Sequence, residues 1–341
     1  MNTHIKSNIN MTFNFDTNDE NSDQNSKENI DCSVPNCLQR FYTLIDASGF
    51  IFRAFYAIKT NMLSTSGIPI NAVYGYCSML LKLLEERISN DIPDENEVII
   101  AVFDAARYNF RNKIYEGYKA NRKEIPSELI PQFSIIREIT KSIGLPIIEM
   151  NMYEADDIIA TYVNECKQSG DVCRIVSSDK DLMQLIDDDK NIFIYDTMKN
   201  QILHENDVFK KFCVLPKQVT DIQSLIGDST DNIPGVSGIG PKTAADLISK
   251  FQTLENIYLN LNIIKNERIR NLLILNKDNA IISKQLATLK NDIDLPKKLQ
   301  SFSPIKINFD SFIEFCKTLN FSSIIDRTLK LKNRISTKSQ S

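Results

Sequence analysis

Short hydrophobic runs recur through the first part of the chain, and three of them lead directly into aspartates. The runs FYTLID and VIIAVFD end at Asp46 and Asp104, and the run CRIVSS leads into Asp179. Stretches with helical periodicity separate these runs. The expected strands cover residues 42–45, 98–103, 146–149, 174–177 and 192–195, and the expected helices cover 72–86, 128–143, 156–169 and 182–186. This alternation predicts an α/β fold with a mostly parallel sheet covered on both faces, followed after about residue 215 by a helical region.

Carboxylates gather where this fold would bring strand ends together. The carboxyl ends of strands in an open α/β sheet share one crevice, where such sheets bind ligands. Nine converging carboxylates would repel one another unless divalent cations neutralised them, and the chain has only 2 histidines to compete as ligands. The pattern therefore predicts a hard-metal site for phosphate chemistry. The nine are Asp46, Asp104, Glu154, Asp156, Asp157, Asp179, Asp181, Asp228 and Asp231.

Helix capping is the alternative explanation for each cluster taken singly. An aspartate after a strand often caps a helix or forms a turn, and acids at a helix start are stabilised by its dipole. In YEADD, however, the helix continues as the apolar run DDIIATYV and is expected to pack against the sheet. Capping accounts for one cluster but poorly for four.

A glycine-rich turn, PGVSGIGPKTAADLI, follows the last acid cluster. Its glycines allow the bare backbone N–H groups to approach a phosphate, and Lys242 and Thr243 open the next helix, where an anion is also favoured. The turn resembles a helix–hairpin–helix element that grips a nucleic-acid backbone without reading its sequence. An ordinary helix–turn–helix connection with glycine caps is the alternative. The three glycines are Gly235, Gly238 and Gly240.

The stretch after Asp104, AARYNFRNKIYEGYKANRKEIP, mixes basic and aromatic residues. A solvated surface helix would explain the charge but not so many rings beside it. Bases that hold phosphates and rings that stack on unpaired nucleobases are typical of single-strand binding. Phe52 and Arg53, which follow Asp46, extend the same path. The six basic residues of the stretch are Arg107, Arg111, Lys113, Lys119, Arg122 and Lys123.

Composition sets few further limits. The formal charge of −4 neither supports nor excludes a polyanionic substrate, because nine of the acids belong to the expected metal site. The 7 cysteines are scattered and indicate a reducing compartment, not a disulfide framework. No apolar run approaches the roughly 18 residues of a membrane span. Residues 1–40 are polar and aperiodic, and we expect them to be disordered.

Taken in order, these motifs resemble the 5′-nuclease (5′-3′ exonuclease) domain of bacterial DNA polymerase I, within the flap endonuclease superfamily. The most specific pieces are LIDASGFIFRAFYA, VFDAARYNFRNKIYEGYKANR, YEADD, SSDKDLMQL and GDSTDNIPGVSGIGPKTA. The resemblance spans about residues 42–329. It implies a PIN-like core, a mobile helical arch and a helix–hairpin–helix subdomain. The implied division is a tail at 1–40, a core at 41–215 with the arch at about 105–135, the subdomain with the C-terminal helices at 216–330, and a polar tail at 331–341.

The resemblance also implies roles for individual residues. The holders of the first metal are Asp46, Asp104, Glu154 and Asp156; those of the second are Asp179, Asp181, Asp228 and Asp231, with Asp157 supporting the site. Lys119 and Arg122 fall where the family places arch residues that contact the scissile phosphate. Arg53 and Arg111 match further phosphate contacts, and Phe52 matches a stacking aromatic. The metals would be two Mg²⁺ or Mn²⁺, and a monovalent cation such as K⁺ would bridge the hairpin at Gly235–Gly240 to DNA.

The expected function is that of a structure-specific 5′-3′ exonuclease and 5′-flap endonuclease for primer removal and repair. Two metal ions about 4 Å apart would activate a water and stabilise the leaving oxygen. We expect a monomer in the bacterial cytoplasm, at the nucleoid and away from membranes, acting on 5′ flaps, 5′ ends and RNA–DNA primers beside a separate DNA polymerase. The chain leaves no room for the polymerase domain found in most relatives, so we expect a stand-alone nuclease or a fragment.

Two other function classes share part of this pattern. A module that binds junction DNA without cutting it would keep the fold and the hairpin, but the complete acid set argues against it. A metal-dependent phosphatase of small substrates would explain the carboxylates but not the hairpin or the basic aromatic stretch. It would also need a DxD nucleophile pair, whereas Asp46 is followed by Ala47 and Ser48.

Overall fold

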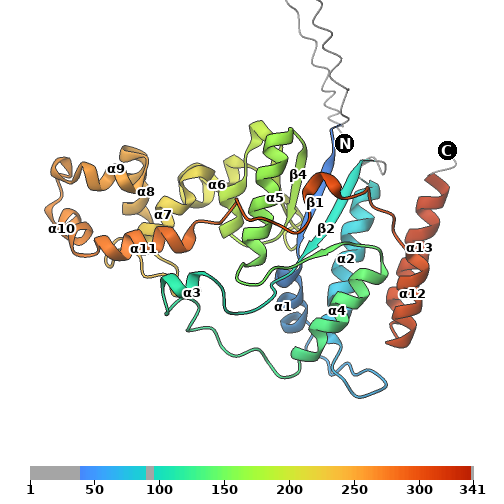
Figure 1. The fold of residues 1–341 in the computed structure, drawn as a ribbon. Coiled ribbons are helices and arrows are strands. Elements are labelled where there is room, and N and C mark those ends of the chain that lie inside the picture. The colour runs from blue at the N-terminus through green and yellow to red at the C-terminus, as the bar shows by residue number, and fades with distance from the viewer. Residues whose placement is uncertain (1–38, 90–95, 339–341) are drawn as a thin grey trace, which may run out of the picture. The chain divides into compact units, whose positions relative to one another are not determined.

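A six-stranded sheet forms the centre of the protein. The computed structural model describes residues 39–89 and 96–338, so the tail expected at 1–40 lies almost entirely outside the described residues. The strand order is β3-β2-β1-β4-β5-β6, and Figure 1 shows β1 between β2 and β4. All neighbouring pairs are parallel except β5 and β6. The strands are β1 (Phe41–Asp46), β2 (Glu97–Val102), β3 (Ile147–Ile148), β4 (Val172–Val176), β5 (Ile192–Asp196) and β6 (Gln201–Leu203).

Alternating strand residues feed two hydrophobic cores, one on each face of the sheet. On β2, for example, Val98 and Ile100 belong to one core, whereas Ile99 and Ala101 belong to the other. This is the period-2 pattern of a sheet that is buried on both faces. The first core lies under α5 (Ala155–Ser169). The second lies under α1 (Ala47–Ala57), α2 (Asn71–Ser89) and α4 (Ile130–Ser142).

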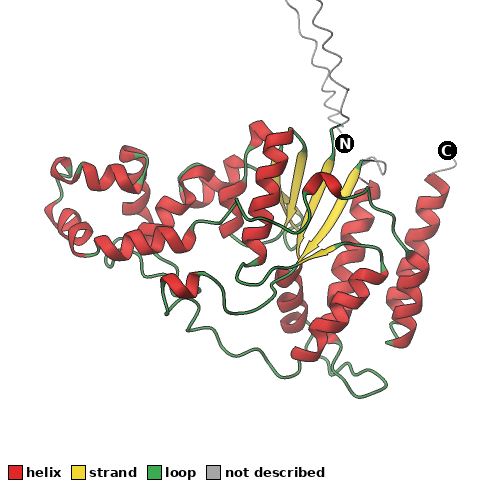
Figure 2. Cartoon of the chain, in the orientation of Figure 1, coloured by secondary structure: helices red, strands yellow, loops and turns green. Residues whose placement is uncertain are grey.

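A helical region follows the sheet and shares the core on the α5 side (Figure 2). Among the described residues no strand follows Leu203, which confirms the expected change to helices. No described helix is both long and apolar enough to cross a bilayer. The helices of this region are α6 (Glu205–Phe212), α7 (Val219–Ile226), α8 (Pro241–Phe251), α9 (Leu254–Leu259), α10 (Glu267–Leu275) and α11 (Lys277–Ala287).

The last two helices return to the core beside the sheet instead of joining the helical region. Phe312 of α12 (Phe309–Thr318) and Ile324 of α13 (Ser322–Lys338) pack in the core that also contains α2 and α4. Helix α13 continues to Lys338, beyond the polar tail expected from residue 331, because Leu331 is buried in that same core. The expected grouping of residues 216–330 therefore differs from the packing.

Two local elements also differ from expectation. The arch segment between β2 and α4 contains one short helix, α3 (Arg111–Ile114), and is otherwise made of turns, so it is much less helical than the resemblance implies. The helix expected at 182–186 is a 3-10 helix over Asp181–Leu185. Its first turn includes Asp181, and the hydrogen bond from the N–H of Asp181 to the carboxylate of Asp179 stabilises the tight turn.

Candidate functional site

Two acids of the predicted site stand at the carboxyl ends of adjacent central strands. β1 lies between β2 and β4, where the strand order reverses, and such a switch point opens a crevice outside the strand ends. Asp46 ends β1 and caps α1, accepting hydrogen bonds from the Gly49 N–H at 2.9 Å and the Ser177 hydroxyl at 2.8 Å. Asp104 follows β2 and accepts a hydrogen bond from the Ala155 N–H at 2.8 Å. The bond from the Ala155 N–H to Asp104 places the start of α5, with Asp156, beside the end of β2.

The charges of these acids are poorly compensated. Burial, together with the neighbouring charges of Asp104 and Asp179 and against the hydrogen bond from Gly49, raises the pKa of Asp46 to about 6. Burial, Asp179 and Asp46 also raise the pKa of Asp156 well above its usual range. The pKa of Asp181 rises to about 7 through burial and the charge of Asp179. Burial raises the pKa of Asp104 as well. These four carboxyl groups and Asp179 thus form one electrostatic cluster.

The other acids each have a cationic partner. Glu154 pairs with Lys119 and accepts a hydrogen bond from the Tyr118 hydroxyl at 2.9 Å. Asp231 pairs with Arg122 and lies 3.6 Å from the Lys119 Nζ. These contacts bring Lys119 and Arg122, from the arch segment, beside acids from α5 and from the loop after α7.

Asp228 has a partner that the sequence analysis missed. Its carboxylate accepts a hydrogen bond from the Lys180 Nζ at 2.6 Å and another from the Thr230 N–H at 2.8 Å. Burial alone would raise the pKa of Asp228, but the bond from Lys180 and the Thr230 N–H hold it below its usual range. Lys180 stands between Asp179 and Asp181 in SSDKDL, so its position in the motif was the available signal.

Lys119 is fixed by its backbone as well as by its side chain. It has a φ of 55°, which is uncommon for a residue other than glycine, and its N–H donates to the Asp231 carbonyl at 2.9 Å. Its Nζ lies 5.0 Å from the centre of the Tyr118 ring. Burial would lower the pKa of Lys119, but Glu154, Tyr118 and Asp231 together raise it, so the side chain stays charged. The side chain of Arg122 is 45% exposed and can reach a ligand outside the cluster.

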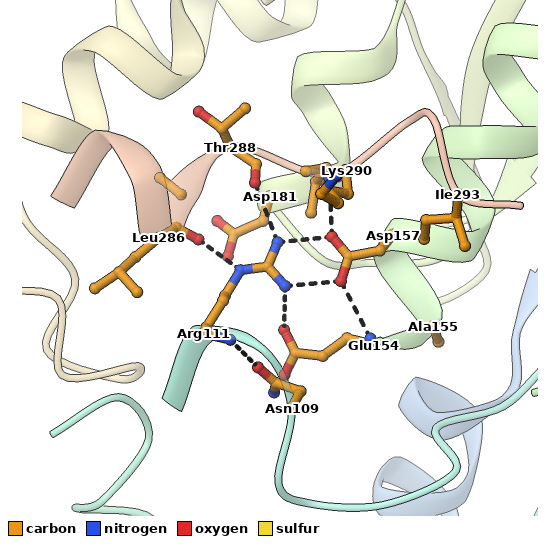
Figure 3. A network of polar contacts seen from close by, with 12 residues as sticks. Asn109, Arg111, Glu154, Ala155, Asp157, Asp181, Leu286, Thr288, Lys290 and Ile293 are labelled. Atoms are coloured by element: carbon orange, nitrogen blue, oxygen red, sulfur yellow. Dashed lines mark hydrogen bonds and ion pairs between the residues drawn. The ribbon is translucent and has the colours of Figure 1, made fainter. Parts of the chain in front are cut away.

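Arg111 does not lie where the resemblance places it. Its side chain is 1% exposed and forms a bidentate pair with Asp157, both N···O distances being 2.7 Å (Figure 3). Such burial leaves no surface for a DNA phosphate, so the structure does not support the expected phosphate contact. The Asp157 side chain is 0% exposed, and both of its carboxylate oxygens accept hydrogen bonds from Arg111. It therefore offers no free oxygen to a metal.

Phe52 and Arg53 both project from α1. The Phe52 ring packs edge-on against Phe133, with 6.1 Å between centroids, and stays half-buried. Arg53 donates hydrogen bonds to the Ser178 and Thr197 hydroxyls, and Ser178 immediately precedes Asp179. The structure thus places Arg53 at the rim of the acid cluster and keeps only part of the Phe52 ring accessible.

The glycine turn between α7 and α8 contains glycines of two kinds. Gly235 is buried with a φ of 64°, a Cβ there would lie 2.4 Å from the Gly227 nitrogen, and its N–H donates to the Ser283 hydroxyl at 2.8 Å. This glycine serves close packing and cannot offer its N–H to DNA. Gly238 and Gly240 are exposed, and Gly240 is the N-cap of α8. Lys242 is exposed beside them, and Thr243 is half-buried.

The donor set of the acid cluster suits a hard divalent cation, which prefers carboxylate oxygens. Within the described residues, no ion pair involves Asp46, Asp104, Asp156, Asp179 or Asp181. The raised pKa values of four of them show that added positive charge would be favourable. No three acidic, His or Cys side chains of the described chain converge closely enough to hold a metal as they stand.

Two family models match this chain, one after the other. The N-terminal resolvase-like domain of 5′-3′ exonucleases matches residues 41–213, and their C-terminal SAM fold matches residues 214–310. The 5′-3′ exonuclease of Aquifex aeolicus is 33% identical over 297 residues, which cover 87% of this chain and 98% of that protein. DNA polymerase I of Rhizobium leguminosarum is 42% identical over 284 residues, 83% of this chain, but the match covers only 28% of the polymerase.

Solved structures show the same fold. The T5 5′-exonuclease with zinc ions bound superimposes with a TM-score of 0.60 at 17% identity, covering 87% of this chain and 99% of that one. The catalytic core of Rad2 in complex with DNA gives a TM-score of 0.58 at 17% identity, covering 86% and 92%. These matches confirm the expected fold class, with a mostly parallel sheet and a C-terminal helical part.

Proposed function

Because this chain belongs to the 5′-3′ exonuclease family of metal-dependent nucleases, we propose that it hydrolyses DNA phosphodiesters at 5′ ends and 5′ flaps. One observation carries the proposal. Five carboxyl groups that form no ion pair within the described part of the chain lie near the switch point of the sheet, and Lys119 and Arg122 border them. A site of this kind attracts divalent cations and, through its two basic residues, a phosphate.

Oxygen ligands for two Mg²⁺ or Mn²⁺ ions are available in this cluster. Asp46, Asp104, Glu154 and Asp156 would hold one ion, and Asp179, Asp181, Asp228 and Asp231 the other. When bound, such ions supply a hydroxide nucleophile at neutral pH and charge stabilisation for the leaving oxygen. Lys119 and Arg122 would exchange their carboxylate partners for the scissile phosphate and offset its developing charge. Lys180, which now pairs with Asp228, would change partner in the same way.

DNA on either side of the scissile bond would contact basic and exposed residues around the site. We assign duplex binding to the hairpin at Gly238, Gly240, Lys242 and Thr243, with a monovalent cation such as K⁺ at the turn. Arg53 would hold a further phosphate, and the accessible edge of Phe52 would stack on a nucleobase. The division into a nuclease core and a DNA-binding subdomain near residue 215 belongs to this proposal.

The length and identity of the relatives support a proposal for the biological setting. The chain spans about a third of the DNA polymerase I relatives that it matches and almost the whole of the Aquifex 5′-3′ exonuclease. We propose a monomeric enzyme of the bacterial cytoplasm, acting at the nucleoid. It would remove RNA–DNA primers and flaps beside a separate DNA polymerase.

Single-turnover cleavage of a 5′-labelled flap duplex with Mg²⁺ tests the function directly. We expect cutting near the junction, and we expect EDTA or the Asp104→Ala substitution to abolish it. Loss of at least about 10⁴-fold in rate is reasonable, since metal charge stabilisation contributes several kcal/mol and each 1.36 kcal/mol is tenfold. DNA binding by Asp104→Ala should persist. Tight binding without cutting by the unmodified protein would instead indicate a module that only binds junction DNA.

A further inference from the structure

Arg111 is the most completely bonded charged side chain near the site. Its Nε donates to the Leu286 carbonyl at 2.8 Å, and one Nη donates to the Thr288 carbonyl at 3.1 Å. The bidentate pair with Asp157 and a contact of 3.3 Å to Glu154 use the rest of the guanidinium (Figure 3). An arginine has five N–H donors, and each of them has a partner here. Arg111 therefore joins three chain segments: the start of the arch, α5, and the C-terminal end of α11.

Asp157, its partner, is bonded just as fully. Besides the two bonds from Arg111, it accepts one from the Lys290 N–H at 2.9 Å and one from the Glu154 N–H at 3.1 Å. The last bond is half of a capping box at the start of α5. Since both carboxylate oxygens are in use, Asp157 acts through Glu154 and not on a ligand.

Glu154 is consequently held at both ends by this pair. Asp157 fixes its backbone N–H, and Arg111 contacts one oxygen of its carboxylate while Lys119 contacts the other. The start of the arch is fixed too, because the Arg111 N–H donates to Asn109 at 2.8 Å and Asn109 is 0% exposed. Loosening of Arg111 would remove one of the three side-chain contacts that hold the Glu154 carboxylate, the others coming from Lys119 and Tyr118.

We infer that Arg111 is a positioning residue, which with Asp157 orients the Glu154 carboxylate toward the metal-binding cluster and anchors the arch beside it. This inference rests on the proposed function, in which Glu154 is a metal ligand. It differs from a phosphate contact, because a phosphate contact must be accessible and must contribute to DNA affinity.

The test uses the full chain and a neutral pair, R111Q/D157N. Replacing both partners avoids leaving one buried charge alone, and the amides keep hydrogen-bonding capacity. The single substitution R111K keeps the charge but loses the bidentate geometry. The matched control is R327Q/E85Q, because Arg327 also forms a bidentate pair with Glu85, at 2.7 Å for both contacts, and also bonds a carbonyl, that of Ser78. That pair joins α13 to α2, outside the acid cluster.

Two readouts distinguish positioning from a purely structural role. Calorimetric titration with Mn²⁺ alone should show metal affinity weakened about 10- to 100-fold in R111Q/D157N and R111K, the usual effect of losing a residue that orients a ligand. Single-turnover cleavage of the flap duplex at saturating DNA should slow by a similar factor, whereas the Kd for DNA in EDTA and its salt dependence stay at the unmodified level. The control pair should change neither readout.

The outcomes separate this inference from the proposed function. Unmodified protein that neither binds Mn²⁺ nor cleaves would end the proposed function. Unmodified protein that does both, alongside an R111Q/D157N variant with equal Mn²⁺ affinity and rate, would overturn the inference and leave the function standing. Weaker DNA binding by R111Q/D157N with a salt slope reduced by about 1, at an unchanged saturated rate, would identify Arg111 as a phosphate contact and would also overturn it. The Mn²⁺ titration needs no cleavage, so it tests the inference even if the unmodified protein binds metal without cutting this DNA.

Discussion

The nine acids of the site fall into two groups that differ in how the protein balances their charge. The unpaired carboxylates have no Lys, Arg or His partner among the described residues and are Asp46, Asp104, Asp156, Asp179 and Asp181. The paired carboxylates each bond to a lysine or arginine and are Glu154, Asp157, Asp228 and Asp231. Burial and like charges raise the pKa of four unpaired carboxyl groups, whereas Lys180 lowers the pKa of Asp228.

The comparison shows that one cluster of carboxylates can serve two purposes. The paired carboxylates hold the arch, α5 and the loop after α7 together through ion pairs, so they stabilise the fold without any ligand. The unpaired carboxylates destabilise the fold in their charged form and gain from an added cation. Under the proposed function, the free energy lost in assembling the unpaired group would be regained when metal binds, since a ligand that binds only the folded state stabilises it.

The largest expected difference between the groups is that substitutions in them change the free energy of unfolding in opposite directions. Asp157→Ala leaves the buried Arg111 without its bidentate partner and should lower the free energy of unfolding by about 3–5 kcal/mol. Asp156→Asn removes one of several repelling charges and should raise it, in EDTA at pH 7.5, by about 1 kcal/mol, the scale of one pKa unit. Urea unfolding followed by circular dichroism measures both changes, as shifts of the midpoint at constant slope.

Mg²⁺ should reverse the second effect. With the metal present, the unmodified protein should become more stable than Asp156→Asn, because the substitution removes a ligand. Equal destabilisation by the two substitutions in EDTA would show that the groups do not differ in the way described.

A smaller effect is expected on the cleavage rate when Lys119, which pairs with Glu154 beside the unpaired carboxylates, is replaced. Lys119→Ala should slow single-turnover cleavage by about 10²–10³-fold, because a preorganised charge at the transition state is lost. The Kd for flap DNA should change little, since exposed basic residues remain along the path. The control is Lys113→Ala, on the same segment but exposed and without a carboxylate partner among the described contacts. A cleavage rate that Lys119→Ala leaves unchanged would remove Lys119 from the reaction.

Much of this arrangement could be predicted because it depends on local pattern and on sheet topology. Alternating apolar residues predict the strands, and parallel strands place their ends at one edge, so the positions of Asp46 and Asp104 follow from the sequence. The family resemblance then accounts for Lys119 and Arg122, whose contacts with Glu154 and Asp231 are consistent with their expected place.

Other features depend on contacts that no local pattern contains. Arg111 lies in a basic, polar segment that is typical of an exposed surface, yet its burial depends on Asp157 and on the carbonyls of Leu286 and Thr288, far along the chain. Gly235 looks equivalent to Gly238, but the backbone at Gly227 packs against it alone. The return of α12 and α13 to the nuclease core likewise follows from tertiary packing of residues such as Phe312.

The smallest expected effect is a dependence of metal-free stability on pH. Asp46 has a pKa near 6 and Asp181 near 7 in the folded protein, both above the unfolded value of 3.8. A carboxyl group with a raised pKa contributes stability that is complete below the unfolded value and is lost as the pH rises through the folded value. In EDTA, the free energy of unfolding should therefore fall between pH 5 and pH 8 by about 1–2 kcal/mol, on the scale of 1.36 kcal/mol per pKa unit shared among coupled groups. Asp228 has a lowered pKa, so its contribution is lost only on acidification below the unfolded value and does not change in this window.

Urea midpoints measured at several pH values should show this fall in the free energy of unfolding, and saturating Mg²⁺ should abolish it. Asp46→Asn should reduce the slope while keeping the cap of α1, because asparagine caps helices as well as aspartate does. Stability that rises with pH across this window would mean that the unpaired carboxylates are compensated after all.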